Sequence, residues 1–110
     1  MKVMGGPFSF SSELTRRWME SKIQFKILRE IASRGGFAFK VIKANRNGIP
    51  DVVAIYKGMA ILVEVKDKDG RVSEVQRRQI ARARDAGAYA LVARTVGDVT
   101  DIMDKIDEKD

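Results

Sequence analysis

The chain has no cysteine and no histidine among its 110 residues. Without cysteine there is no disulfide framework, which favours an intracellular, cytoplasmic location. Without histidine the chain cannot form a histidine-ligated zinc site, a serine–histidine triad or a histidine general base. Any catalysis must therefore use carboxylates, lysine, hydroxyls and a hard metal ion such as Mg²⁺ or Mn²⁺.

Long apolar runs are missing as well. No segment approaches the roughly 18 apolar residues that a membrane helix needs, and the N-terminal segment lacks the apolar stretch of a secretory signal. We therefore expect no membrane partner. The length and the apolar fraction of 45% fit one small domain with a modest core. The formal net charge of +6 favours polyanionic partners such as nucleic acid.

Turn signals and hydrophobic periodicity predict the order α-β-β-β-α-β-α, with residues 1–11 as a flexible arm before a single domain over 12–110. The expected helices and strands cover about 12–33, 37–43, 52–56, 59–63, 73–86, 88–93 and 98–107. Asn47-Gly48 is typical of a hairpin turn. Because a strand–helix–strand crossover pairs its strands in parallel, the sequence predicts an α/β fold: a mixed four-stranded sheet flanked by helices, with an extra C-terminal helix.

The register of the central hairpin follows from its turn. A two-residue turn at 57–58 pairs Tyr56 with Met59, and the same rule places Asp51 directly opposite Glu64. The two Cβ atoms would then lie about 5 Å apart on one face of the sheet. Because like charges in such a position repel, this pair requires a nearby cation.

Lys66 lies on the same face as Glu64, since side chains of a strand alternate with a period of two. One interpretation is a sheet edge at which Lys66 simply neutralises Glu64, as exposed ion pairs often do. The other is a metal site, because carboxylate oxygens are suitable ligands for Mg²⁺ or Mn²⁺. Asp51 opposite Glu64 favours the metal site.

The first helix carries a carboxylate on its apolar side. Glu20 falls inside the arc formed by Ile23, Ile27, Leu28 and Ile31. A buried charge costs free energy unless a partner compensates it. We therefore expect Glu20 to face the same region as the sheet carboxylates.

Gln76 has two interpretations that the sequence leaves open. Ser73 and Gln76 have the spacing of a capping box, in which the Gln76 side chain bonds the Ser73 N–H. Gln76 also lies on the packed side of its helix, together with Val75 and Ile80, where it could support a site on the sheet.

Four segments together resemble the VRR-NUC family of the PD-(D/E)xK nuclease superfamily. They are a glutamate-bearing opening helix, a G-x-P-D element, an E-x-K strand and a second helix, at residues 19–24, 48–51, 61–66 and 70–76, followed by Gly87. The likeness covers about residues 19–95. It implies a restriction-endonuclease-like αβββαβ core, which agrees with the element order above.

The resemblance implies a metal-dependent, structure-selective DNA endonuclease that acts on branched DNA, such as Holliday junctions, as a homodimer. Glu20, Asp51 and Glu64 would be metal ligands together with the Val65 carbonyl. Lys66 would orient or activate the attacking water. Gln76 would support the site from the second helix.

Basic side chains border this predicted site and are candidates for phosphate contacts: Lys43, Arg46, Lys68, Arg71, Arg77 and Arg78. A solvated basic surface is the alternative, and part of it could serve a dimer interface. Two alternative functions also remain: a non-catalytic nucleic-acid-binding module of the same fold, and a nuclease that acts on other DNA or RNA structures.

Overall fold

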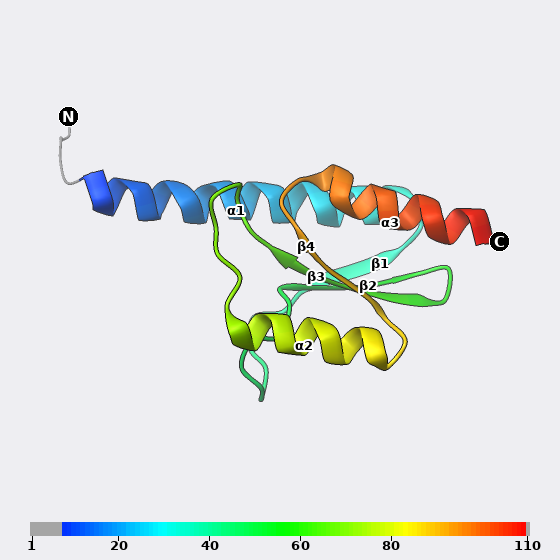
Figure 1. The fold of residues 1–110 in the computed structure, drawn as a ribbon. Helices are drawn as coiled ribbons and strands as arrows, with labels where there is room; N and C mark the ends of the chain where they lie inside the picture. The colour runs from blue at the N-terminus through cyan, green and yellow to red at the C-terminus, as the bar shows by residue number, and fades with distance from the viewer. Residues whose placement is uncertain (1–7, 110) are drawn as a thin grey trace.

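The computed structural model describes the backbone of residues 8–109 and the side chains of residues 13–109. Within this range, three helices and four strands follow in the order α-β-β-β-α-β-α, as predicted (Figure 1). They are α1 (Phe8–Ser33), β1 (Phe37–Lys40), β2 (Val52–Tyr56), β3 (Met59–Val65), α2 (Glu74–Asp85), β4 (Tyr89–Ala93) and α3 (Val96–Lys109). No helix within the described part of the chain is long and apolar enough to cross a membrane.

The four strands form one mixed sheet in the order β1-β2-β3-β4. The pairs β1–β2 and β2–β3 are antiparallel, whereas β3 and β4 are parallel and are connected through α2. The predicted meander followed by a parallel crossover is confirmed. The crossover brings the carboxyl ends of β3 and β4 to the same edge of the sheet.

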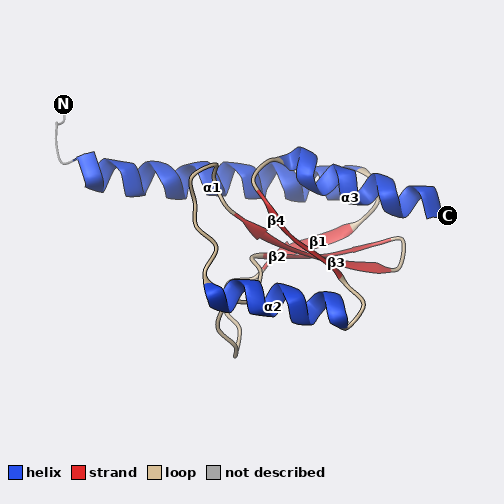
Figure 2. Ribbon diagram, viewed as in Figure 1, coloured by secondary structure: helices blue, strands red, loops and turns tan. Residues whose placement is uncertain are grey.

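Helices cover the two faces of the sheet unequally (Figure 2). The long helix α1 and the C-terminal α3 pack together on one face, where Ile27, Ile31 and Met103 join the buried strand residues in the main core. On the other face, α2 packs on β3 and β4. None of the described helices therefore packs on the half of that face formed by β1 and β2.

The tight turn between β2 and β3 sets their register. Lys57 and Gly58 both have positive φ, at 50° and 80°, a backbone that suits the twist of a two-residue hairpin. Tyr56 pairs with Met59 and Val52 pairs with Val63, as predicted from the turn. The same register directs Asp51, the residue just before β2, toward Glu64.

Some details of the N-terminal half differ from the prediction. Helix α1 begins at Phe8 rather than at Ser11 or Ser12; residues 1–7 of the expected arm lie outside the described residues. Strand β1 ends at Lys40 instead of residue 43. The Asn47-Gly48 signal does not form a two-residue hairpin, because it lies within a longer connection over 41–51.

That connection departs from a tight turn because it packs on a distant helix. A Cβ built at Gly48 would lie only 2.5 Å from Val75 Cγ1 of α2, and Gly48 has a positive φ of 76°. The glycine is therefore needed for close approach and for backbone geometry. Pro50 is buried at the end of the connection, and β2 starts after it, at Val52.

The caps of α2 and α3 follow one scheme. Ser73 and Gln76 form the predicted capping box at the start of α2. At α3 the expected cap, Asp98, is instead the reciprocal partner, because α3 already begins at Val96. Asp98 Oδ2 accepts from the Thr95 N–H at 3.2 Å, and Thr95 Oγ1 accepts from the Asp98 N–H at 3.3 Å. Thr95 is therefore the cap residue.

Candidate active site

Asp51 is held at the open end of the central hairpin by its own backbone and side chain. Its carbonyl accepts from the Val41 N–H at 2.7 Å, which extends the β1–β2 pairing by one bond. Its Oδ2 accepts from the Val65 N–H at 3.0 Å. Asp51 thus spans from the start of β2 to the end of β3, beside Glu64.

Glu64 is buried, with 3% of its surface exposed. Its Oε2 accepts from Gln76 Nε2 at 2.9 Å and lies 3.7 Å from Lys66 Nζ. Its Oε1 is buried and has no hydrogen-bond partner among the described residues. Unpaired buried acceptors are rare and costly. This free oxygen therefore marks a position where a ligand is expected.

The raised pKa of Glu64 also favours a bound cation at this position. Burial raises the pKa of the Glu64 carboxyl, and the neighbouring Asp51 charge raises it further, whereas Lys66 lowers it, so that it stands at about 8. The pair would therefore retain a proton at neutral pH. A divalent cation between the two carboxylates would replace that proton and stabilise both negative charges.

Glu20 belongs to α1 and approaches the site from the face of the sheet opposite α2 (Figure 2). Its Oε2 accepts from the Asp67 N–H at 3.4 Å, where the chain leaves β3. A Cβ built at Gly70 would lie 3.2 Å from the same oxygen, so the segment after β3 passes close to this carboxylate. The charge of Glu20 also contributes to the raised pKa of Glu64. Glu20 therefore lies at the margin of the site.

The donor set suits a hard cation, although the carboxylates are not gathered as a closed cage. Within residues 8–109, no group of three or more acidic side chains has the spacing to hold a metal ion. Two adjacent carboxylates, one with a free buried oxygen, nevertheless fit Mg²⁺ or Mn²⁺, which commonly take one or two carboxylates and keep several waters. The expected third ligand, Glu20, is engaged by the Asp67 amide.

Gln76 both caps α2 and contacts Glu64. Its Oε1 accepts from the Ser73 N–H at 2.9 Å and completes the capping box, while its Nε2 donates to Glu64. The two ends of one amide thus couple the start of α2 to the buried carboxylate. Lys66 Nζ lies 3.7 Å from Glu64 Oε2, so the ion pair between these two residues is present.

Two residues near the site were not singled out from the sequence. Arg94 Nη1 donates to the carbonyls of Asp67 and Gly70, which fixes the segment that meets Glu20. Asp67 is itself nearly buried and pairs with Arg16 at 3.7 Å. The only sequence signal for Arg94 is its position directly after an apolar strand. Its hydrogen-bond partners could not be predicted, because they depend on where the parallel crossover places that strand.

The predicted phosphate-binding side chains are all exposed and come from three places. They lie in the β1–β2 connection (Lys43, Arg46), in the segment after β3 (Lys68, Arg71) and on α2 (Arg77, Arg78). Arg77 also pairs with Glu74 at 3.6 Å. Arg46 lines an open pocket of about 320 Å³ between the β1–β2 connection, β3 and α2. The basic surface is therefore divided among segments that flank the carboxylates.

The sequence of residues 11–97 matches the VRR-NUC domain family. The chain belongs to the VRR-NUC domain family. A solved VRR-NUC domain structure superposes with a TM-score of 0.68 at 27% identity, covering 78% of this chain and 95% of that one. The resemblance inferred from the four segments and the restriction-endonuclease-like fold are thus confirmed.

One further relative is named a nuclease and another a Holliday junction resolvase. A protein of Acyrthosiphon pisum secondary endosymbiont phage 1, named "Putative nuclease p44", is 32% identical over 74 residues, which span 66% of this chain and 80% of that protein. The Holliday junction resolvase Hjc of Archaeoglobus fulgidus matches with a TM-score of 0.53 and 28% identity, over 66% of this chain and 65% of Hjc. The family and these relatives support a nuclease.

Proposed function

We propose that this VRR-NUC protein is a divalent-metal-dependent, structure-selective endonuclease that hydrolyses phosphodiester bonds in branched DNA. The observation that carries the proposal is the buried, unpartnered Oε1 of Glu64 beside Asp51. Such a pair is unfavourable in isolation and becomes favourable around a cation. Similarity to a Holliday junction resolvase supports branched DNA as the substrate class.

Asp51, Glu64 and the Val65 carbonyl would hold Mg²⁺ or Mn²⁺, with Glu20 completing the set directly or through water. When bound, such an ion lowers the pKa of water and neutralises charge on the phosphate oxygens. Lys66, 3.7 Å from Glu64, would orient the attacking water or stabilise charge that develops on the phosphate. Gln76 keeps Glu64 in a fixed orientation through its 2.9 Å hydrogen bond.

The basic side chains around the site would bind the DNA backbone. Lys43, Arg46, Lys68, Arg71 and Arg78 are exposed and come from segments on different sides of the carboxylates. Contacts of this kind position a phosphate without reading base sequence. They therefore favour selection of the substrate by DNA shape. An enzyme of this kind would work where cellular or phage DNA is found, in the cytoplasm or nucleoid.

A homodimer is part of the proposal. The open half of the sheet carries an apolar patch of Phe37, Phe39 and Ile55, which we call the β1–β2 patch. Phe37 and Ile55 are cross-strand partners, and the two phenylalanine rings lie 5.8 Å apart. Because the patch has no charged member, a second copy related by two-fold symmetry would cover it without like-charge repulsion. Two sites would then serve two opposed strands.

The central test is cleavage of a labelled four-way junction with Mn²⁺ or Mg²⁺, against an EDTA control. Asp51→Ala and Glu64→Ala are expected to keep the fold and DNA binding but to lose cleavage. Asp101→Ala, which removes an exposed carboxylate of α3, is the matched control and should cleave normally. Full cleavage by either site variant would contradict the proposed site.

Other outcomes identify the alternative functions. Junction binding without nicking, across both metals and several DNA structures, would indicate a non-catalytic nucleic-acid-binding module. Preferential cleavage of a matched RNA would indicate an RNA nuclease. For the dimer, light scattering of Phe37→Glu should give a smaller mass than the unmodified chain. Leu14→Glu, which adds the same charge at an exposed apolar residue of α1 outside the patch, is the control and should keep the mass of the unmodified chain. A monomeric unmodified chain, with and without junction DNA, would contradict it.

A further inference from the structure

The outward side of α1 carries aromatic and basic side chains in alternation. Trp18, Lys22, Phe25, Lys26 and Arg29 fall within an arc of about 100° at the helical repeat, opposite the side that enters the core. We call this set the α1 stripe. None of its members was assigned a role above, and Glu20, the site residue on the same helix, points the other way.

The aromatic rings of the α1 stripe are exposed and accompanied by cations. Trp18 is 59% exposed and Phe25 is 60% exposed, which is unusual for such large apolar groups. Lys22 Nζ lies 4.3 Å from the Trp18 ring centre, and the Arg29 guanidinium lies 5.6 Å from that of Phe25. Each ring thus forms a cation–π pair one helical turn away.

The cations of the stripe have no acidic partner among the described side chains. Among the described side chains, Lys22, Lys26 and Arg29 form no ion pair within 4.0 Å. The nearby acidic residue Glu30 is engaged with Arg34 at 3.1 Å. The stripe therefore presents net positive charge to solvent.

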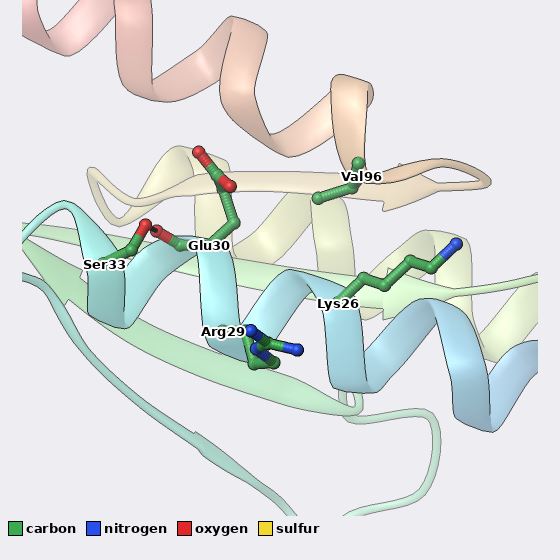
Figure 3. A pocket seen from close by; sticks show the side chains of 5 residues that line it. All are labelled: Lys26, Arg29, Glu30, Ser33 and Val96. Carbon is green, nitrogen blue, oxygen red and sulfur yellow. Dashed lines mark hydrogen bonds between the residues drawn. The ribbon is translucent and has the colours of Figure 1, made fainter.

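The surface at the stripe is hollowed in two places. Trp18, Lys22, Phe25 and Lys26 line an open pocket of about 230 Å³ together with Ser21. A second open pocket, of about 330 Å³, lies between α1 and the start of α3. Figure 3 shows Lys26 and Arg29 at this second pocket, with Val96 across from them. Both pockets are open to solvent, so an extended chain has access along the helix.

We propose that the α1 stripe binds single-stranded DNA by stacking unpaired bases on Trp18 and Phe25 while Lys22, Lys26 and Arg29 contact the phosphates. Exposed aromatic rings within a positively charged track are the features of sequence-tolerant single-strand binding. The rise from Trp18 to Phe25 is about 10 Å, close to three base steps of roughly 3.4 Å. The rings can thus engage bases of one strand.

A second copy of the chain is a poorer occupant than a nucleic acid. In a two-fold interface the same surface meets itself, so the three cations of one stripe would face those of the other. The β1–β2 patch, which lacks charge, avoids this repulsion and suits self-association. A polyanion is attracted by the same cations, and stacking accounts for the rings.

The stripe is separate from the carboxylate site and acts by binding alone. In a branched substrate that carries a single-stranded arm, such as a flap, the stripe would receive that arm and guide the branch point toward the carboxylates, a role that rests on the proposed nuclease function. Binding of the single strand itself does not rest on that function, because it needs no metal. The two can therefore be measured apart, with EDTA present for binding and Mn²⁺ present for cleavage.

The chain offers a direct spectroscopic test, because Trp18 is its only tryptophan. Titration with a twelve-residue oligothymidylate in EDTA should quench the Trp18 fluorescence, since stacking places a base against the indole. An abasic oligonucleotide of equal length carries the same phosphates without bases. It should bind more weakly and leave the fluorescence unchanged.

Variants separate stacking from charge. Phe25→Ala should weaken oligothymidylate binding roughly ten- to hundred-fold, which corresponds to about 1.4–2.8 kcal/mol for one stacked base. Trp18→Phe should retain binding, whereas Trp18→Ala should lose it to a similar extent, as followed by anisotropy of a labelled oligonucleotide. Ile42→Ala, which removes an exposed apolar side chain outside both the stripe and the β1–β2 patch, is the control and should bind normally.

Several results would overturn the proposal. One is equal affinity for the abasic and the thymidylate oligonucleotide. Another is an equal loss of duplex and single-strand binding in Phe25→Ala, since duplex DNA offers no unstacked bases. A change from dimer to monomer in Phe25→Ala would indicate that the stripe is a protein interface. By contrast, normal single-strand binding without any junction cleavage by the unmodified chain would contradict the nuclease function and leave this proposal standing.

Discussion

Gln76 and Glu64 are joined by a 2.9 Å hydrogen bond from the Gln76 amide to Glu64 Oε2. The other end of the same amide accepts from the Ser73 N–H and caps α2. The orientation of the buried carboxylate is therefore tied to the start of the crossover helix. One side chain thus links local helix stability to the candidate chemistry, and the two effects can be separated by substitution.

Gln76→Glu is expected to preserve α2 but to impair cleavage. A glutamate at this position still completes a capping box, whereas it loses the donor to Glu64 and adds a like charge beside it. Loss of a hydrogen bond to a charged group, at about 1.5–3 kcal/mol, corresponds to a rate reduction of roughly ten- to a hundred-fold. Thermal unfolding and junction cleavage measured side by side check this. Unchanged cleavage would show that Gln76 only caps the helix.

Glu64 should make the metal-free protein less stable as pH rises. The pKa of Glu64 is about 8 in the folded chain against 4.5 in the unfolded one, so the unfolded state loses its proton first. Between these values the folded state binds more protons, and the free energy of unfolding falls as pH increases. In EDTA, the melting temperature of Glu64→Gln should exceed that of the unmodified chain at pH 8 by more than at pH 5. Parallel pH profiles would contradict the shifted pKa.

Arg94→Gln should weaken both stability and cleavage, because Arg94 bonds the Asp67 and Gly70 carbonyls in the segment that meets Glu20. Losing these charged hydrogen bonds is expected to cost about 1–3 kcal/mol of unfolding free energy. Arg84→Gln is the matched control, since Arg84 Nε also donates to a carbonyl, that of Ala90, away from the carboxylates. Urea unfolding should detect a loss in both variants, whereas only Arg94→Gln should cleave more slowly.

Gly70→Ala should disturb the site more than the fold. A Cβ there would lie 3.2 Å from Glu20 Oε2, Asp67 Oδ1 and Lys66 Cβ, so these groups must shift by a few tenths of an ångström. We expect a several-fold loss of cleavage with little change in melting temperature. Gly97→Ala is the control, because its added Cβ would meet only Thr95 Oγ1 at an ordinary 3.5 Å. Equal cleavage by the two variants would argue against a positional role for Glu20.

The sequence predicted the parts of this protein that depend on local geometry. The turn at 57–58 fixes a two-residue hairpin, and the hairpin register then brings Asp51 next to Glu64 without knowledge of any other element. The capping box at Ser73 and Gln76 is likewise a four-residue pattern. The apolar crossover strand and its helix imply parallel pairing. Four short motifs in order were also sufficient to indicate the family, which the match over residues 11–97 confirms.

The tertiary structure decided the relationships between residues distant in sequence. A helical wheel places Glu20 on the inner side of α1, but only packing determines that its carboxylate reaches the Asp67 amide. The partners of Arg94 depend on where the crossover returns, and the Asn47-Gly48 signal gave way to the contact between Gly48 and α2. The exposure of Trp18 and Phe25 could not be predicted, because an apolar side chain is exposed only where no other element covers it. Periodicity and turn chemistry act over a few residues, whereas burial depends on the whole chain.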